Sequence, residues 1–355
     1  MNILVLRFSA MGDVALAQPV IKQILSQNAN VEITLVTKPE FAPLFAGLPR
    51  FKFFGANFKS DFKGLSGLVK LQKQLLTDVP YDSVVDLHDV VRTWVLCFLL
   101  SIKGVPYKRI DKDRASRKKL TRKNNKVFKP IKHTSQKYLD VFRQLGLQTG
   151  DLSDLYSGPS PMPLHPGNRG KALLDAGHFL PKDRPWVGLA PFSKHPQKEW
   201  PLEKIKILIK ALTDEKKFRV LLFGGGKEEI SRLKHLAGDN NDVLNLAGSL
   251  NLAEEMEVVR QLDLMITMDS FNMHLAGLLG VKIVSIWGAT HPYAGFGPLG
   301  KNEKYLVQIP HQHLPCRPCS IFGNRPCWRG DFACMQQITP DMVMEKITLA
   351  LSANL

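Results

Sequence analysis

Two nucleotide-binding signatures are missing from this sequence of 355 residues. No G-x-G-x-x-G turn joins an expected strand to an expected helix, which argues against a dinucleotide-dependent dehydrogenase or epimerase. The glycine-rich turn after Phe223 has glutamate after Lys227, where a P-loop has serine or threonine, so a kinase-type phosphate cradle is excluded. Long apolar runs are also missing. The longest, Trp94 to Ile102, is too short to span a bilayer.

The N-terminal sequence MNILVLRFSAMGD lacks the basic start and apolar core of a signal peptide, so we expect a cytoplasmic protein. Cysteine is scarce, at five residues, which argues against a disulfide scaffold. Four of these cysteines lie close together in the sequence: Cys316, Cys319, Cys327 and Cys334. The first pair has CxxC spacing and the second does not. A structural zinc site and a group of buried or partly oxidised thiols both fit this pattern.

Acidic residues are outnumbered, and the formal net charge is +16. The excess is concentrated between Lys108 and Lys132, where twelve Lys or Arg face only two acids. This segment fits an acceptor that carries phosphates or carboxylates, and a solvated loop is the alternative. Few aromatic residues accompany the charge, so we expect no nucleic-acid partner. The formal DxD at 111–113 begins this basic segment, and we interpret it as a solvated loop.

Short β-rich runs alternate with helical spacing along the whole chain, as in Asn2–Phe8 followed by 14–25. This alternation predicts a parallel, doubly wound α/β sheet. A stretch rich in proline and glycine, residues 157–168, interrupts the pattern, which then restarts at Trp186. We therefore predict two Rossmann-like domains, over residues 1–160 and 161–338. A terminal helix within 339–355 is predicted to pack back across the first domain.

Ligands of open α/β sheets bind at the carboxyl ends of strands, so polar residues just after strands are candidates. Asp13 follows the first strand, and Gly12 before it permits close approach of a ligand. A carboxylate before a helix is often only an N-cap, and this alternative stays open.

The second half offers candidates of the same kind. Ser193 and Lys198 follow its first strand, and a lysine there can hold phosphates. Asp269 and Ser270 lie between a strand and a helix start, where free N–H groups and the helix dipole attract a pyrophosphate. His274, near the first turn, is either a ligand contact or a buried histidine. Glu228 and Glu229 either accept hydrogen bonds from ribose hydroxyls or are only the first residues of a surface helix.

Four motifs now carry a resemblance to the lipopolysaccharide heptosyltransferases of glycosyltransferase family 9. They are LRFSAMGDVALAQPVIKQ, YDSVVDLHDVVRTW, the Lys and Trp of QKEWP, and MDSFNMHLAGLLGVKIVSIWG. The resemblance covers nearly the whole chain. It implies a GT-B fold, in which two Rossmann-like domains face a central cleft. It also implies inverting, metal-independent transfer of a heptose from ADP-heptose to an anionic glycolipid of the lipopolysaccharide core.

By this resemblance Asp13 is the general base and Lys198 holds the phosphates. The resemblance also places Asp269, Ser270 and His274 in the nucleotide site. Further residues predicted for the nucleotide-sugar site are Gly12, Ser193, Glu228, Glu229 and Phe271. Residues predicted to face the acceptor are Arg92, Lys118, Lys119 and Arg122. No cofactor is needed for catalysis, and we expect a monomer that can contact the cytoplasmic face of the inner membrane.

Two positions depart from the family pattern. Phe271 stands where the family commonly has glycine, which crowds the diphosphate, and Asp89 stands where glycine often follows DLH. A related transferase that uses a UDP- or GDP-linked sugar is therefore an alternative. A non-catalytic protein that binds sugars or nucleotides is the alternative from another class.

Overall fold

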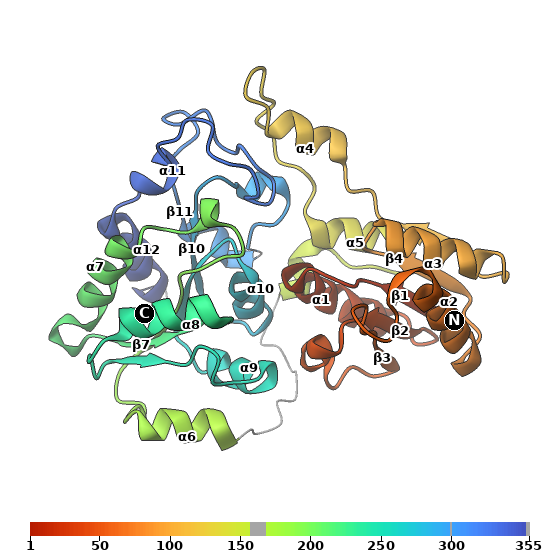
Figure 1. Ribbon diagram of the computed structural model, residues 1–355, viewed down its shortest axis with the longest axis horizontal. Helices are drawn as coiled ribbons and strands as arrows, with labels where there is room; N and C mark the ends of the chain where they lie inside the picture. The colour runs from red at the N-terminus through yellow and green to blue at the C-terminus, as the bar shows by residue number, and fades with distance from the viewer. Residues whose placement is uncertain (157–167, 299, 353–355) are drawn as a thin grey trace. The chain divides into compact units, whose positions relative to one another are not determined.

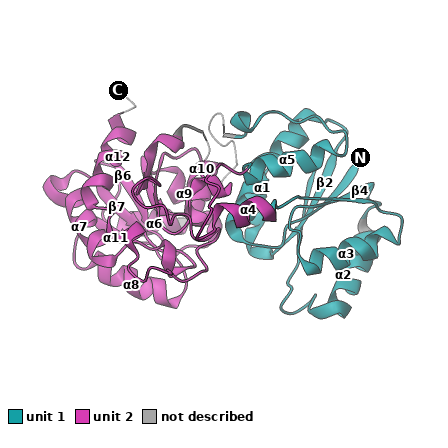
Figure 2. Cartoon of the chain, turned by 90° about the horizontal axis from the view of Figure 1, so that it is seen from above, with its two compact units in different colours: residues 1–113, 132–157, 161–163 teal, residues 114–131, 158–160, 164–355 magenta. Residues whose placement is uncertain are grey.

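The computed structural model describes residues 1–156, 168–298 and 300–352, which form two units. Unit 1 comprises 1–113 and 132–156, and unit 2 comprises 114–131 and the described residues from 168 onward (Figure 2). Most of the basic segment thus belongs to unit 2, although it lies within the predicted domain 1–160. The predicted linker, 157–168, lies almost entirely outside the described residues.

Unit 1 is built on a parallel sheet of five strands in the order β3-β2-β1-β4-β5. The strands are β1 (Asn2–Leu6), β2 (Glu32–Thr37), β3 (Phe51–Gly55), β4 (Ser83–Asp86) and β5 (Tyr107–Arg109). Helices α1 (Met11–Gln27) and α5 (Thr134–Arg143) pack together on one side of it. Helices α2 (Gly64–Asp78) and α3 (Val91–Ser101) pack together on the other (Figure 2). The strand order reverses between β1 and β4.

Unit 2 contains a parallel sheet of six strands in the order β11-β10-β9-β6-β7-β8. The strands are β6 (Trp186–Ala190), β7 (Arg219–Leu222), β8 (Val243–Asn245), β9 (Leu264–Met268), β10 (Ile283–Trp287) and β11 (Leu306–Gln308). The helices are α4 (Arg114–Leu120), α6 (Asn168–Ala176), α7 (Leu202–Thr213), α8 (Lys227–Ala237), α9 (Leu252–Arg260), α10 (Phe271–Leu278), α11 (Ala333–Gln336) and α12 (Pro340–Ser352) (Figure 1). Here the order reverses between β6 and β9. The predicted pair of doubly wound parallel sheets is confirmed.

The C-terminal helix α12 packs on the sheet of unit 2. Its buried side chains Val343, Ile347 and Ala350 join the core that covers β9 and β10. Lys282 Nζ also donates to the carbonyl of Ala350 at 2.6 Å. The apolar stripe of α12 therefore packs against the sheet of unit 2.

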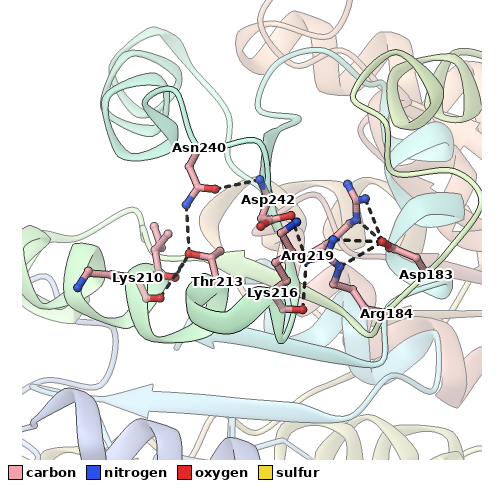
Figure 3. A network of polar contacts seen from close by, with 9 residues as sticks. Asp183, Arg184, Lys210, Thr213, Lys216, Arg219, Asn240 and Asp242 are labelled. Carbon is pink, nitrogen blue, oxygen red and sulfur yellow. Dashed lines mark hydrogen bonds and ion pairs between the residues drawn. The ribbon is translucent and has the colours of Figure 1, made fainter.

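An ion-pair network lies at the amino ends of β6 and β7 (Figure 3). Asp183 accepts from Arg219 at 2.9 Å and pairs with Arg184 at 3.1 Å, and Arg219 lowers the pKa of this carboxyl below its ordinary value. Because ligands of such sheets bind at the carboxyl ends of strands, we interpret this network as structural.

Candidate functional site

Asp13 lies in the first turn of α1, directly after the central strand of unit 1. The N-cap of this helix is Ala10, so the alternative that Asp13 is only an N-cap is wrong. The Asp13 carboxylate instead forms an ion pair with Arg7 at the end of β1. Arg7 is buried and also donates to the carbonyl of Leu87 at 2.8 Å. A buried arginine therefore fixes the position of a carboxylate at the point where the strand order reverses.

Tyr138 on helix α5 contacts both members of the Arg7–Asp13 ion pair. The Tyr138 hydroxyl donates to the backbone carbonyl of Asp13 at 3.3 Å. The Arg7 guanidinium lies 6.0 Å from the centre of the same Tyr138 ring. Both members of the Arg7–Asp13 pair are thus held by one aromatic side chain.

The turn after β4 is built around a buried carboxylate, Asp86. It accepts from Arg109 Nε at 2.7 Å and from the backbone N–H groups of His88 and Asp89 at 3.0 and 2.9 Å. Asp89 has a φ of +50°, in the left-handed region that glycine adopts most easily. Its carboxylate accepts from Trp94 Nε1 at 2.8 Å. Asp89 therefore keeps a glycine-like backbone and adds a bond that fixes the start of α3.

His88 is a site residue that the sequence analysis did not single out. Burial first, then the charges of Arg7, Lys112 and Arg92, lower its pKa to about 2. Its ring contacts Phe8 edge-on, at 5.6 Å between ring centres. The one feature of the sequence that could have indicated His88 is its position in DLH, just after a strand predicted to be buried. The predicted acceptor residue Arg92 lies nearby at the start of α3, with its guanidinium 5.4 Å from the Phe58 ring centre.

In unit 2 the structure brings together the residues predicted to hold the diphosphate. Lys198 Nζ donates to the backbone carbonyl of Asp269 at 2.5 Å and lies 3.3 Å from its carboxylate. The Ser193 hydroxyl donates to the same carbonyl at 3.4 Å. These residues follow β6 and β9, where the order of the second sheet reverses. Lys198 is therefore an ordered cation and not a solvated surface lysine.

A glycine makes room for Lys198. Gly323 has a φ of +76°, and a Cβ there would lie 2.5 Å from Lys198 Cγ. The Trp of the same QKEWP motif has a structural place, because Trp200 is buried and its indole N–H donates to the Ile338 carbonyl at 3.2 Å.

Helix α10 begins at Phe271, with Ser270 as its N-cap. Within the described chain the Ser270 side chain makes no capping bond, and its hydroxyl lies 3.0 Å from that of Thr267. The Ser270 side chain therefore does not occupy the first N–H groups of α10, which are the groups that an anion site at a helix start uses. Phe271 and His274 are both half-buried on this helix.

The two candidate ribose contacts differ from each other. Glu229 accepts from the Gly225 N–H at 2.9 Å, and burial raises its pKa above the ordinary value. It therefore holds the glycine-rich turn that precedes α8. Glu228 lies in the first turn of α8 and is exposed.

The four predicted acceptor residues do not share a unit. Arg92 is in unit 1, whereas Lys118, Lys119 and Arg122 are exposed on or just after α4 in unit 2. The rest of this segment is ordered by packing, since Phe128 stacks on His311 at 3.8 Å between ring centres. Lys126 donates to the carbonyls of Cys316 and Pro318 at 2.7 and 2.8 Å. Burial lowers the Lys126 pKa to about 8.

Of the two interpretations of the clustered cysteines, the structural zinc site is not supported. No group of three or more His, Cys, Asp or Glu among the described residues is arranged to hold a metal ion, and all four clustered cysteines are free thiols. The segment is ordered instead by Arg317, whose buried guanidinium donates to the carbonyls of Gly288, Trp287 and Thr290 at 2.6 to 3.1 Å. A fixed arginine thus orders this segment.

Two buried histidines make stability sensitive to acid. Burial, followed by the Arg317 charge, lowers the pKa of His291 to about 3, and His88 titrates at about 2. Both are neutral at pH 7 in either state. Between pH 6.5 and about 3 the unfolded chain binds protons that the folded chain does not. We therefore expect the free energy of unfolding to fall by about 1.4 kcal/mol per pH unit for each histidine.

Urea unfolding followed between pH 7 and pH 4 tests this. His291→Asn keeps an acceptor for the Tyr293 N–H, which bonds to His291 Nδ1 at 3.0 Å, and should flatten the dependence. His235→Asn, at an exposed position on α8, should leave it unchanged. Equal pH slopes for the wild type and His291→Asn would contradict the assignment.

Among the described residues no helix combines the length and apolar character needed to cross a membrane.

Comparison with known proteins adds to this geometry. The family model of glycosyltransferase family 9 (heptosyltransferase) matches residues 68–321. Lipopolysaccharide heptosyltransferase 2 of Salmonella typhimurium is 27% identical over 192 residues, which cover 51% of this chain and 51% of that protein. The chain thus spans about half the length of the curated relatives it matches first.

Solved structures match along the whole chain. A family 9 glycosyltransferase from Veillonella parvula has a TM-score of 0.77 at 18% identity, covering 99% of this chain and 97% of that one. E. coli heptosyltransferase WaaC, solved with ADP, has a TM-score of 0.69 at 19% identity and covers 99% and 100%. At these identities the likeness supports the fold alone.

Proposed function

Because the chain belongs to glycosyltransferase family 9 (heptosyltransferase), we propose that it transfers a heptose, or a related sugar, from an ADP-sugar to an anionic glycolipid of the lipopolysaccharide core. The observation that carries this proposal is the cluster of Lys198, Asp269 and the α10 N-terminus, at the reversal point of the unit 2 sheet. A lysine and helix N–H groups that the N-cap side chain does not occupy together suit a diphosphate.

The reaction follows from the chemistry of these groups. The Asp13 carboxylate takes the proton of the acceptor hydroxyl, whose oxygen bonds to the anomeric carbon with inversion. The bond from that carbon to the diphosphate breaks, and the nucleotide diphosphate leaves with the electron pair. Lys198 and the first N–H groups of α10 stabilise its growing negative charge without a divalent metal. The transfer rate should therefore survive dialysis against EDTA.

The decisive experiment mixes the protein with ADP-heptose and an acceptor from the lipopolysaccharide inner core. Release of ADP should require the acceptor, which separates a transferase from a sugar-binding protein. ADP at about 100 times its Kd should also stabilise the folded chain by about 2.7 kcal/mol. If ADP, UDP and GDP and their sugars all leave the melting temperature unchanged, the proposal is wrong.

Phe271 favours a second candidate, a transferase that uses a different nucleotide sugar. This large side chain occupies the first position of α10, next to the proposed diphosphate site. Stabilisation by UDP- or GDP-sugars in preference to ADP-heptose would select it. In either case we propose a monomer that works in the cytoplasm, at the inner face of the membrane that carries the acceptor.

The exposed cations after Asp113 are proposed to bind the acceptor. Changing Lys118, Lys119 and Arg122 to glutamine should raise the KM for the acceptor about tenfold, because each cation near an anionic lipid surface contributes about 1 kcal/mol or less. The KM for the donor should not change. Glutamine at three other exposed lysines of unit 2, Lys206, Lys210 and Lys234, provides the control. Equal effects of the two triple variants would contradict a specific acceptor role.

A further inference from the structure

Helix α3 is apolar on both of its faces, although only one of them is covered. Leu96, Cys97 and Leu100 point into the core of unit 1 and are fully buried. On the opposite face, Val91, Phe98 and Ile102 are 67%, 63% and 63% exposed. Their spacing of seven and four residues places them in one stripe along the helix. A helix that is apolar on all sides is normally buried. We therefore expect a binding partner to bury the exposed face of α3.

Further exposed apolar side chains lie on α3 and on the elements next to it. Trp94 on α3 is 42% exposed, Tyr107 at the start of β5 is 41% exposed, and Leu65 on the adjacent helix α2 is 65% exposed. Helices α2 and α3 lie side by side in both views (Figures 1 and 2). Six of the exposed large apolar side chains therefore lie on α2, on α3 and its C-cap Ile102, and on β5.

Positive charge borders this face. Residues 90–110, which contain α3 and β5, include four cations and no acid: Arg92, Lys103, Lys108 and Arg109. One of these cations, Arg109, pairs with the buried Asp86, and Asp89, directly before this range, accepts from Trp94 Nε1. Lys70 and Lys73 are exposed on α2. The Arg109 guanidinium lies 5.7 Å from the ring centre of Trp94 and 5.0 Å from that of Tyr107, so charge and aromatic surface are in contact.

We propose that this face docks onto an anionic phospholipid surface, with the α3 stripe inserted at the level of the headgroups. Such surfaces attract clustered Lys and Arg and accept a helix face with aromatic and aliphatic side chains. A second copy of the chain fits less well, because a two-fold pairing of this face would oppose like charges. The docked helix begins beside Arg92, so it brings a proposed acceptor contact to the membrane surface.

The inference rests on the proposed function only in taking the acceptor to be membrane-borne. The test is flotation of the intact protein with vesicles of phosphatidylcholine alone or mixed with phosphatidylglycerol, without donor or acceptor. The wild type should bind the anionic vesicles, and added salt should weaken the binding. Phe98→Gln combined with Ile102→Gln should lower the partition coefficient at least about tenfold, through the apolar area that stays in water.

The matched control is Ile207→Gln combined with Leu349→Gln, two exposed apolar positions in unit 2, which should bind like the wild type. An equal loss in both double variants overturns the inference, as does a wild type that does not bind. Conversion of a dimer to a monomer by the α3 variant, measured by light scattering, shows instead that a second copy covers this face. Transfer to a water-soluble acceptor fragment should be unchanged in the α3 variant, so failure of the transferase proposal is seen separately.

Discussion

Asp13→Asn is expected to lower the rate of sugar transfer by about 10²- to 10⁴-fold, the usual contribution of a positioned general base. Asparagine keeps the size of the side chain and an oxygen that faces Arg7, but it cannot take a proton from the acceptor hydroxyl. The loss should appear in kcat, whereas the affinity for ADP should stay close to that of the wild type, because the proposed donor site lies in unit 2. Steady-state kinetics and isothermal titration with ADP measure the two quantities.

The control must separate the loss of a base from the loss of an ion pair. Asp140 on α5 also belongs to unit 1 and pairs with Lys132 at 2.6 Å and Arg143 at 2.9 Å. Asp140→Asn should therefore show the effect of neutralising an ion-paired carboxylate without touching the reaction. If Asp13→Asn folds normally and transfers sugar at nearly the wild-type rate, Asp13 is not the base.

Arg7 is a positioning residue in this scheme. Its guanidinium pairs with the Asp13 carboxylate and bonds the Leu87 carbonyl, which connects the turns that follow β1 and β4. The sequence places Arg7 in the LRFSAMGD motif, yet no spacing rule shows that it pairs with Asp13. Contacts across a sheet depend on strand order, and strand order depends on tertiary packing.

The same limit explains which parts of the fold were predictable. Alternating apolar patterns were sufficient for the two parallel sheets, because each buried strand and amphipathic helix carries its own signal. Strands β3, β5, β8 and β11 and helices α4, α5 and α6 were not predicted. Strand β5 and helix α4 are short and lie at or within the basic segment, where charge hides their apolar pattern. Most of that segment belongs to unit 2, where Phe128 stacks on His311, a contact between residues far apart in the sequence.

Helix α12 and the cysteine segment show contacts that spacing and composition alone do not indicate. The spacing of α12 revealed an apolar stripe but not its partner, and the sheet of unit 2 covers it. The CxxC pair suggested a metal, whereas the buried Arg317 guanidinium bonds the surrounding carbonyls. A lone arginine between two cysteines carries no pattern by which a sequence rule can recognise this role.

Lys198→Met is expected to lower kcat/KM for the donor by about 10²- to 10³-fold and to weaken ADP binding. Methionine retains the aliphatic stem that packs against Gly323 but removes the cation beside Asp269. Because the leaving diphosphate gains charge as the bond breaks, the loss should be larger for transfer than for ADP affinity. Kinetics with varied donor, together with titration of ADP, separate the two effects.

A purely structural lysine should behave differently. Lys204 on α7 also bonds backbone carbonyls, those of Gln336 and Ile338, so Lys204→Met should cost stability and leave donor kinetics nearly unchanged. The remaining alternative is that Lys198 only neutralises Asp269. In that case Asp269→Asn should restore transfer to the Lys198→Met variant, because no unpaired carboxylate is left. If Lys198 instead holds the diphosphate, the double variant should remain as slow as Lys198→Met alone.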